Sequence, residues 1–580
     1  MRARVGEAGA TSRFLASGRG TTAMRAAFAF GALCVAWSPF LPAGVAQEPS
    51  GGHPIANETL VAECSSCHRQ DEEGRMSRIS WLRKTPEGWQ TSLIRMRALH
   101  GVDVSAEDAR TIVRYLANEQ GLAPDELRPG LFEVERRLID YDYPGDSEVE
   151  YTCMVCHSMG RVITQRRTRD EWGLLLDTHR ALYPLVDFQS FRRGTRSGDQ
   201  THPMDDAVRH LAAEFPLETP EWSAWSATKR PPRLAGEWAL SGYEPGKGPI
   251  YGTVTITADA ADPEAFTTRA SYVVVESGER VERAGQGLVY TGYQWRGRSS
   301  SNAGQDSELR EVMFVERDVQ TMSGRWFSGG YDEFGPDVTL KRAGSGGAVS
   351  GVYPGALMRG ETATVTVYGV NLQGATADLD FGEGVAVQSV ESLGATSATV
   401  RLTVAPEARV GRRDLFAGSA ILESAVTIHD GVDRIEVTPG TGLARTGGVN
   451  FPKAFQTYEA IGFDDGPDGE PDTEDDLSLG RVEATWRVEE YMAAVGDDDI
   501  RFIGHIRSDG TFEPALEGPN AERSENRNNI GDVWVTATHV NASGDELSAR
   551  AHLVVTVPLY MRFNPWPDPE AVRVPVGGEQ

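Results

Sequence analysis

The sequence predicts a multidomain protein in which an N-terminal helical domain precedes three antiparallel β domains. Two observations lead to this prediction. Before Pro231 the chain shows helical patterns with capping residues, whereas beyond it short alternating strands are separated by turns. The 63 glycines and 31 prolines fit an architecture with many turns. A length of 580 residues allows roughly three to five domains.

Residues 1–46 have the features of a signal peptide. Arginines precede an apolar run at 26–37, and small residues, including Gly44 and Ala46, suit cleavage before Gln47. The apolar run is too short to cross a bilayer comfortably. We therefore expect export to the periplasm and no membrane insertion.

Two cysteine motifs follow the leader, Cys64-Ser65-Ser66-Cys67-His68 and Cys153-Met154-Val155-Cys156-His157. Cys-x-x-Cys-His is the attachment signature of c-type haem, in which two thiols bind the porphyrin vinyl groups and the histidine reaches the iron. Cys34 lies in the leader, so the mature chain has no other cysteine. Two copies in an exported chain favour haem over a zinc knuckle or a redox dithiol. The sequence predicts two covalently bound haems c on Cys64, Cys67, Cys153 and Cys156, with His68 and His157 as iron ligands.

The two motifs lie in repeated helical units, at about 56–124 and 140–216. Seven identities share one offset of 83 residues. The identical pairs are Arg83 and Arg166, Thr85 and Thr168, Trp89 and Trp172, Leu93 and Leu176, Arg97 and Arg180, Ala98 and Ala181, and Leu99 and Leu182.

The repeat also selects the distal iron ligands, because Met96 falls on His179 under the same offset. Both residue types can be sixth ligands of haem iron. We predict His68 with Met96 at the first haem and His157 with His179 at the second. His100 is an alternative to Met96, since it lies four residues on and on the same helical face. A methionine ligand would raise the potential of the first haem, so electrons would run from the second haem to the first.

The domain boundaries follow from composition. We expect a di-haem cytochrome c domain at 47–228 and an antiparallel β-barrel or sandwich at 232–344. Two immunoglobulin-like sandwiches follow at 347–431 and 432–560, and a proline-bearing tail occupies 561–580. Trp238, Trp295 and Trp326 are predicted to be core or interface residues.

The formal net charge of −27 argues against nucleic acid and anionic membranes as partners. The carboxylates of residues 464–476 resemble a calcium loop. However, Pro467 and Pro471 break the EF-hand register and the final glutamate is missing. A solvated acidic loop is favoured, and calcium stays an alternative. Dinucleotide, P-loop and hydrolase signatures do not stand out.

The chain resembles the α subunit of bacterial quinohaemoprotein amine dehydrogenase. The resemblance rests on the two haem motifs, the Arg-x-Thr-x-x-x-Trp repeats at 83–89 and 166–172, Gly236-Glu237-Trp238, and Gly466-Pro467-Asp468-Gly469. It implies a periplasmic heterotrimer with a β-propeller subunit and a small subunit that carries a tryptophylquinone. The heterotrimer oxidises primary amines, and the di-haem subunit passes electrons to a small cupredoxin or cytochrome c.

A quinone held by thioether bonds needs spare cysteines, and here all four mature cysteines are assigned to haem. The quinone is therefore expected on a partner, and this chain is not expected to be catalytic alone. Three alternatives stay open: a di-haem peroxidase-like enzyme, the electron-transfer subunit of another periplasmic dehydrogenase, and a non-catalytic scaffold protein.

Overall fold

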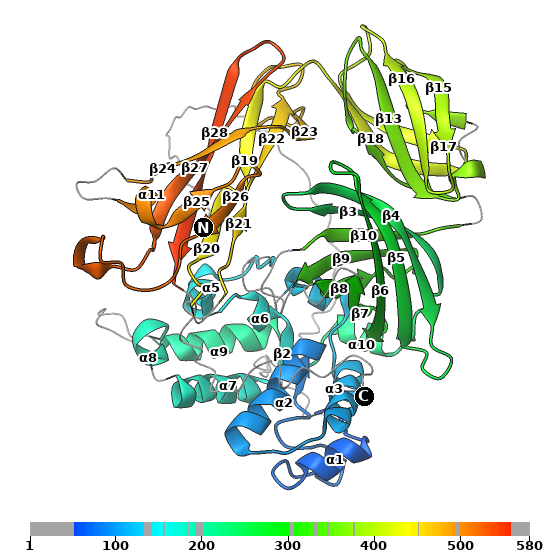
Figure 1. Ribbon diagram of the computed structural model, residues 1–580. Coiled ribbons are helices and arrows are strands. Elements are labelled where there is room, and N and C mark those ends of the chain that lie inside the picture. The colour runs from blue at the N-terminus through cyan, green and yellow to red at the C-terminus, as the bar shows by residue number, and fades with distance from the viewer. Residues whose placement is uncertain are drawn as a thin grey trace, which may run out of the picture. The chain divides into compact units, whose positions relative to one another are not determined.

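The computed structural model describes residues 51–557, apart from 133–140, 155–156, 184, 192–200, 302–306, 329–334, 345–346, 375–377, 450–451 and 493–497. The predicted signal peptide, the predicted tail at 561–580 and Cys156 lie outside the described residues. An N-terminal helical region is followed by sheets that dominate the rest of the chain (Figure 1).

The helical region contains two similar units and a short exit helix. Its first unit holds α1 Glu58–Cys64, β1 Leu82–Lys84, α2 Pro86–His100, α3 Ala106–Glu119, α4 Pro124–Leu127 and η1 Arg128–Gly130. The second holds α5 Ser147–Met154, α6 Gly160–Ile163, β2 Gln165–Arg167, α7 Arg169–Leu182, α8 Val186–Gln189 and α9 Pro203–Glu214, and α10 Pro220–Ser226 follows. Ser105 caps α3, because its side chain accepts a hydrogen bond from the backbone N–H of Asp108.

The two units share local structure at the positions that the repeat aligns. Thr85 caps α2 and Thr168 caps α7 through the same side-chain bond to the backbone three residues on. The indole N–H of Trp89 donates to the carbonyl of Gln120 at 3.2 Å, and that of Trp172 donates to the carbonyl of Phe215 at 3.1 Å. Gln120 directly follows α3, and Phe215 directly follows α9. The 83-residue offset therefore corresponds to equivalent contacts.

The units are joined by an antiparallel pair of short strands, β1 and β2, in which Arg83 lies opposite Arg166. Both arginines reach the buried carboxylate of Glu126. Arg83 donates to its two oxygens at 2.8 and 2.9 Å, and Arg166 forms an ion pair with it at 3.1 Å. Arg83 also donates to the carbonyls of Gly121 and Leu217. One carboxylate thus compensates two buried cations at the junction.

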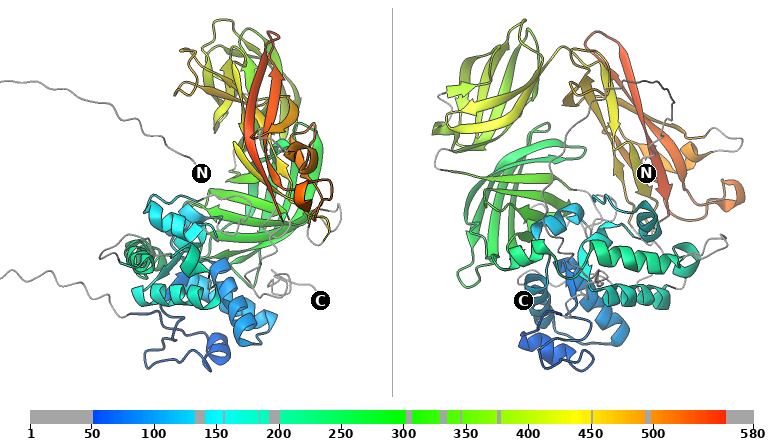
Figure 2. Two further views of the ribbon diagram at one scale, coloured as in Figure 1. Left: turned by 90° about the vertical axis from the view of Figure 1, so that its left-hand side faces the viewer. Right: turned by 180° about the vertical axis from the view of Figure 1, so that it is seen from behind.

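The second domain is a closed barrel, so the predicted alternative between barrel and sandwich resolves in favour of the barrel (Figures 1 and 2). Its antiparallel strands follow the order β10-β3-β4-β5-β6-β7-β8-β9. They are β3 Gly236–Glu244, β4 Gly248–Ala258, β5 Ala265–Val274, β6 Glu279–Tyr290, β7 Gln294–Ser301, β8 Leu309–Val315, β9 Thr321–Ser328 and β10 Asp337–Arg342. Trp238, Trp295 and Trp326 are buried, as predicted.

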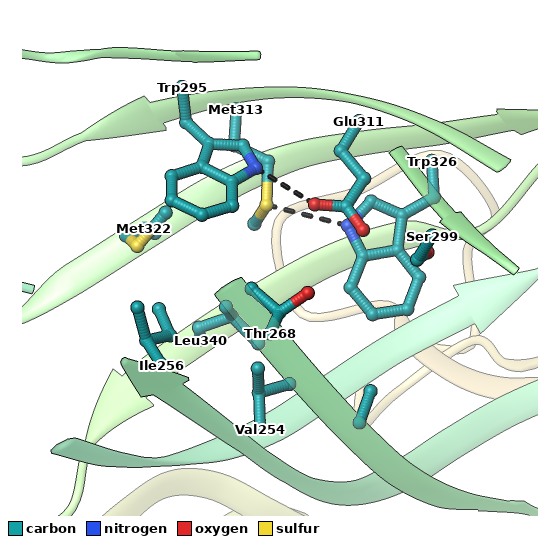
Figure 3. Close-up of a pocket in the computed structure, with 11 residues that line it drawn as sticks. Val254, Ile256, Thr268, Trp295, Ser299, Glu311, Met313, Met322, Trp326 and Leu340 are labelled. Carbon is teal, nitrogen blue, oxygen red and sulfur yellow. Dashed lines mark hydrogen bonds between the residues drawn. The ribbon is translucent and has the colours of Figure 1, made fainter. Parts of the chain in front are cut away.

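The barrel interior is filled with side chains around one buried carboxylate, Glu311 (Figure 3). Its Oε2 accepts a hydrogen bond from the indole N–H of Trp295 at 2.8 Å. Burial raises the pKa of Glu311, although the bonds from Trp295 and Ser299 oppose this shift. The remaining cavity of about 10 Å³ has room for roughly one water molecule.

The last two domains are built from mainly antiparallel sheets with separate hydrophobic cores, and each includes one parallel pair, β12 with β18 in the third domain and β20 with β28 in the fourth. The third has sheets β11-β13-β16-β15 and β12-β18-β17-β14, and the fourth has sheets β20-β28-β27-β24, β19-β22-β23 and β21-β26-β25. Their immunoglobulin-like topology remains a prediction.

The elements of these two domains have the following bounds. The third contains β11 Ala348–Tyr353, β12 Ala356–Met358, β13 Thr362–Val370, η3 Leu372–Gly374, β14 Leu379–Asp380, β15 Val385–Leu393, β16 Ser397–Val404, β17 Gly411–Ala417 and β18 Ala420–His429. The fourth contains β19 Arg434–Thr438, β20 Thr441–Arg445, β21 Gln456–Thr457, β22 Glu459–Asp464, β23 Leu477–Arg481, β24 Thr485–Glu490, α11 Asp499–Phe502, β25 Gly504–Ile506, β26 Thr511–Pro514, η5 Ser524–Asn526, β27 Gly531–Val540 and β28 Glu546–Thr556.

The first helical unit is fixed to the barrel by ionic and apolar contacts. Arg114 of α3 binds Asp262 at 2.5 Å and Glu264 at 2.7 Å, both in the segment between β4 and β5. Trp222 and Trp225 of α10 belong to the same buried core as the barrel interior. The helical region and the barrel therefore share a core as well as a salt-bridge network.

The carboxylate at the junction generates a stability prediction. Replacing Glu126 by glutamine leaves two buried arginines without their counter-charge, so the free energy of unfolding should fall by about 3–5 kcal/mol. Denaturant unfolding measures this loss. The matched control is Asp125→Asn on the exposed side of α4, which should leave stability nearly unchanged. Equal stability of Glu126→Gln and the unmodified protein would contradict the assigned role.

The ionisation of Glu126 predicts that the protein loses stability at acid pH. Burial alone would raise the pKa of Glu126, but the hydrogen bonds and charges of Arg83 and Arg166 lower it from 4.5 to about 2. Because the folded-state pKa is depressed, its stabilising contribution is complete above about pH 4.5 and is lost as the pH falls toward 2. The difference in stability between the unmodified protein and Glu126→Gln should shrink across this range.

Candidate functional site

The first cysteine motif lies at the end of α1. Asn57 caps this helix, since its side chain accepts a hydrogen bond from the Leu60 N–H at 2.8 Å. After Cys64 the chain turns, and the backbone N–H groups of Cys67 and His68 both donate to the Cys64 carbonyl, at 3.2 and 2.9 Å. The turn gathers the two thiols and the imidazole of the motif into one compact segment.

The histidines predicted as ligands share one hydrogen-bonding pattern. The Nδ1 atom of His68 lies 2.7 Å from the carbonyl of Ser77, that of His157 lies 2.9 Å from the carbonyl of Ser158, and that of His179 lies 2.8 Å from the carbonyl of Leu175. A carbonyl oxygen only accepts, so Nδ1 is the protonated nitrogen in each ring. Each Nε2 is left with a free lone pair, which is the arrangement that orients a metal-binding histidine.

His157 and His179 lie across a gap that matches one iron atom. Their ring centroids are 6.3 Å apart. Two imidazoles bound to one metal through Nε2 at about 2 Å place their centroids roughly 6 Å apart. Burial lowers the pKa of His157 to about 4, which favours the neutral ring that binds a metal. The residues present therefore fit bis-histidine ligation of a haem iron.

At the first site, Met96 lies on α2 at the position that His179 occupies on α7. Met96 is half-buried, whereas the alternative ligand His100 is exposed at the end of α2, directly before the left-handed Gly101. This placement favours Met96 over His100. The assignment of both distal ligands stays a prediction.

The cysteines have properties that suit haem attachment better than redox chemistry. Burial, with smaller contributions from Glu63 and Cys67, raises the pKa of the Cys64 thiol to about 11. Burial also raises the pKa of Cys153 to about 11. A redox dithiol needs a lowered thiol pKa. Within the described part of the chain, no three or more His, Cys, Asp or Glu side chains group as a metal-ion site.

The acidic loop at 464–476 is organised around an arginine. The guanidinium of Arg434 binds Asp465 at 2.6 Å and also binds Asp476. Thr473 donates to Asp475 at 2.7 Å. These carboxylates are already compensated by a protein cation, which supports the interpretation as a solvated loop over the calcium alternative.

Sequence reasoning missed a group of cationic side chains where the two units meet. Lys84 of β1 and Arg167 of β2 are both buried, and each lies over the tryptophan of its own unit. They are also 83 residues apart, so the repeat register carried the signal. A cation at the same position in both units is unusual for a buried strand.

The helical region carries histidines and cysteines in this arrangement, and three β domains follow it. Together these features define a multidomain haem-binding protein. The chain matches the haem-binding family of the quinohemoprotein amine dehydrogenase alpha subunit over residues 55–222. It also matches domain II of that subunit over 231–343, domain III over 347–430 and domain IV over 435–568. The chain belongs to the quinohaemoprotein amine dehydrogenase α-subunit family, as the sequence resemblance implied.

Other comparisons add little. No curated protein matches the chain. A redesigned β-barrel matches with 12% identity and a TM-score of 0.17, covering 19% of this chain and 92% of its own. A Bacteroides ovatus SGBP-B structure matches with 10% identity and a TM-score of 0.17, covering 56% of this chain and 64% of its own. TM-scores this low identify no shared overall fold.

None of the helices in the described segments is long and apolar enough to cross a membrane.

If His157 and His179 both bind the second haem iron, removal of His179 should change the haem spectrum. In His179→Gly the second haem should stay attached but lose its sixth ligand, so its iron should become high-spin. Added imidazole should fill the vacated space and restore the low-spin spectrum. Optical and electron paramagnetic resonance spectra measure both changes.

The control is Asp177→Asn, an exposed position two residues away on α7, whose spectrum should match that of the unmodified protein. An unaltered low-spin spectrum in His179→Gly would show that another residue binds the iron.

Proposed function

We propose that this chain is the di-haem electron-transfer subunit of a periplasmic quinohaemoprotein amine dehydrogenase. It accepts electrons from a tryptophylquinone on a separate small subunit during oxidative deamination of primary amines. It then passes them to a small cupredoxin or cytochrome c. Membership of the α-subunit family supports the assignment to an amine dehydrogenase.

The observation that carries the electron-transfer role is the geometry at the second site. The ring centroids of His157 and His179 are 6.3 Å apart, a separation that suits one iron between them, and Nδ1 of each ring is used by a backbone carbonyl, which leaves Nε2 to bind the metal. Haem bound there supplies one-electron redox chemistry. If His157 and His179 both bind the iron, no position would be left on it for peroxide or another substrate. This argues against the peroxidase-like alternative, which needs an open axial position.

The chain's own residues hold the haems rigidly. Cys64 and Cys67 would tether the first haem and Cys153 and Cys156 the second, while His68 and Met96 complete the ligand set. The carbonyls of Ser77, Ser158 and Leu175 fix the orientation of the three imidazoles. Fixed ligands suit electron transfer, because little reorganisation accompanies a change of one charge.

The remaining assignments extend the proposal. A β-propeller subunit and a small quinone-bearing subunit complete a heterotrimer. The leader at 1–46 directs the chain to the periplasm, where haem attachment of this kind takes place. The four mature cysteines leave none for a quinone crosslink, so the chain is not catalytic alone.

This function predicts an amine-dependent reduction of the haems that requires the partner subunits. Adding a primary amine anaerobically to the complete complex should convert both haems to the ferrous form, as read from the haem absorption bands. The isolated, fully matured chain should stay ferric under the same conditions. An oxidised cupredoxin added afterwards should restore the ferric spectrum.

The Met96→Lys variant serves as an internal test of electron order. Loss of the methionine ligand should lower the potential of the first haem and slow its reduction by the second haem. Reduction of the second haem by amine should persist. Amine oxidation by the isolated chain would contradict the assignment of amine oxidation to a partner subunit. Peroxide turnover by the matured chain would favour the peroxidase alternative.

A further inference from the structure

The segment that follows the first cysteine motif contains an unusual backbone position, Arg78. The backbone N–H of Ile79 donates to the carbonyl of Met76 at 3.1 Å, which closes a tight turn with Ser77 and Arg78 at its centre. The φ angle of Arg78 is 67°, in the left-handed region that favours glycine. A glycine would adopt this conformation at lower cost, so the turn by itself does not explain an arginine here.

This turn is bound to the histidine predicted as the proximal ligand of the first haem. The carbonyl of Ser77 lies 2.7 Å from Nδ1 of His68. The backbone N–H of Ser77 also donates to the carbonyl of Arg69, the residue after His68, at 3.0 Å. Two hydrogen bonds therefore hold the turn against the histidine, so a movement of the turn would change the orientation of the imidazole.

The side chain of Arg78 leaves the first unit and binds the second. Its Nε donates to the carboxylate of Glu171, in the first turn of α7, at 3.0 Å. Glu171 is buried, whereas Arg78 lies at the surface. Arg167 is 3.8 Å from the same carboxylate, which is beyond hydrogen-bond distance. The contact between Arg78 and Glu171 thus supplies what a glycine in the turn could not.

Glu171 shares its helix with the predicted distal ligand of the second haem. In an α-helix the N–H of Leu175 donates to the carbonyl of Glu171, four residues earlier. The carbonyl of Leu175 in turn lies 2.8 Å from Nδ1 of His179. A continuous series of covalent and hydrogen bonds therefore joins the imidazole of His68 to that of His179. The ion pair of Arg78 with Glu171 is the step that crosses between the units.

We propose that the ion pair between Arg78 and Glu171 positions the two haem sites relative to each other and thereby controls electron transfer between the haems. Arg78 is a positioning residue in this proposal, because it acts on the first haem through Ser77 and His68. In the transfer step one electron leaves the second haem, which becomes ferric, and enters the first, which becomes ferrous. This inference rests on the proposed function, because it requires a haem at each site.

The main test is Arg78→Gly in the fully matured protein. Glycine keeps the left-handed turn and removes only the guanidinium, at a surface position. Pulse radiolysis delivers single electrons to the haems, and absorption then follows the transfer from the second haem to the first. The rate should fall by roughly 2- to 30-fold, the range expected when residues that couple two sites are removed. Arg78→Lys, which keeps the charge, should recover part of the rate.

A second variant separates positioning from a simple effect of charge. Arg78→Gly removes a positive charge and Glu171→Gln removes a negative one, so an electrostatic effect would change the transfer rate in opposite directions. A positioning effect slows the transfer in both variants. The double variant should then be no slower than the slower single variant, because both changes break one contact. The matched control is Asp170→Asn, an exposed carboxylate beside Glu171, which should leave the rate unchanged.

Electron paramagnetic resonance gives a readout across the units. The signal of the first haem should change in Glu171→Gln, although this residue belongs to the second unit, because the orientation of His68 changes. Should Glu171→Gln fail to fold, the rates of Arg78→Gly and Arg78→Lys decide the question.

An unchanged transfer rate in Arg78→Gly, with both haems attached, would overturn this proposal but leave the proposed function intact. Opposite changes in rate in the two single variants would overturn it as well. Absence of either haem from the unmodified, matured protein would instead refute the proposed function.

Discussion

The structure of the helical region depends on one buried carboxylate. Glu126 compensates Arg83 and Arg166, which face each other where the strands of the two units pair. These arginines occupy equivalent positions of the repeat, so the carboxylate lies near the local symmetry axis that relates the units. Because β1 leads into α2 and β2 leads into α7, this contact sets the relative position of the helices that carry Met96 and His179.

The paired strands carry two groups of buried cations, which differ in how their charges are compensated. Arg83 and Arg166 share a protein carboxylate and hold the units together. Lys84 and Arg167, one residue along each strand, are less fully compensated: Lys84 donates to the Ser92 hydroxyl, and Arg167 lies 3.8 Å from the carboxylate of Glu171. Alternation of side chains along a strand sends neighbouring residues to opposite faces. The two groups of cations therefore lie on opposite faces of the two-stranded ribbon.

Much of this organisation could be predicted from the sequence. The motifs and the 83-residue repeat placed Met96 and His179 on equivalent helices, and the aligned threonines Thr85 and Thr168 cap those two helices. Barrel closure, by contrast, depends on pairing between β3 and β10, which lie about a hundred residues apart and leave no local signal. The buried cations Lys84 and Arg167 were missed for a different reason: the repeat aligns them, but their burial depends on tertiary packing.

The central claim is that two covalently attached haems, the second with two histidine ligands, relay electrons for chemistry on another subunit. Intact mass combined with electron paramagnetic resonance of the chain, matured in a host that attaches haem c, tests it most directly. The account predicts the mass of two added haems and two low-spin ferric signals, one of them typical of bis-histidine ligation. A single added haem, or a high-spin second haem, would contradict it.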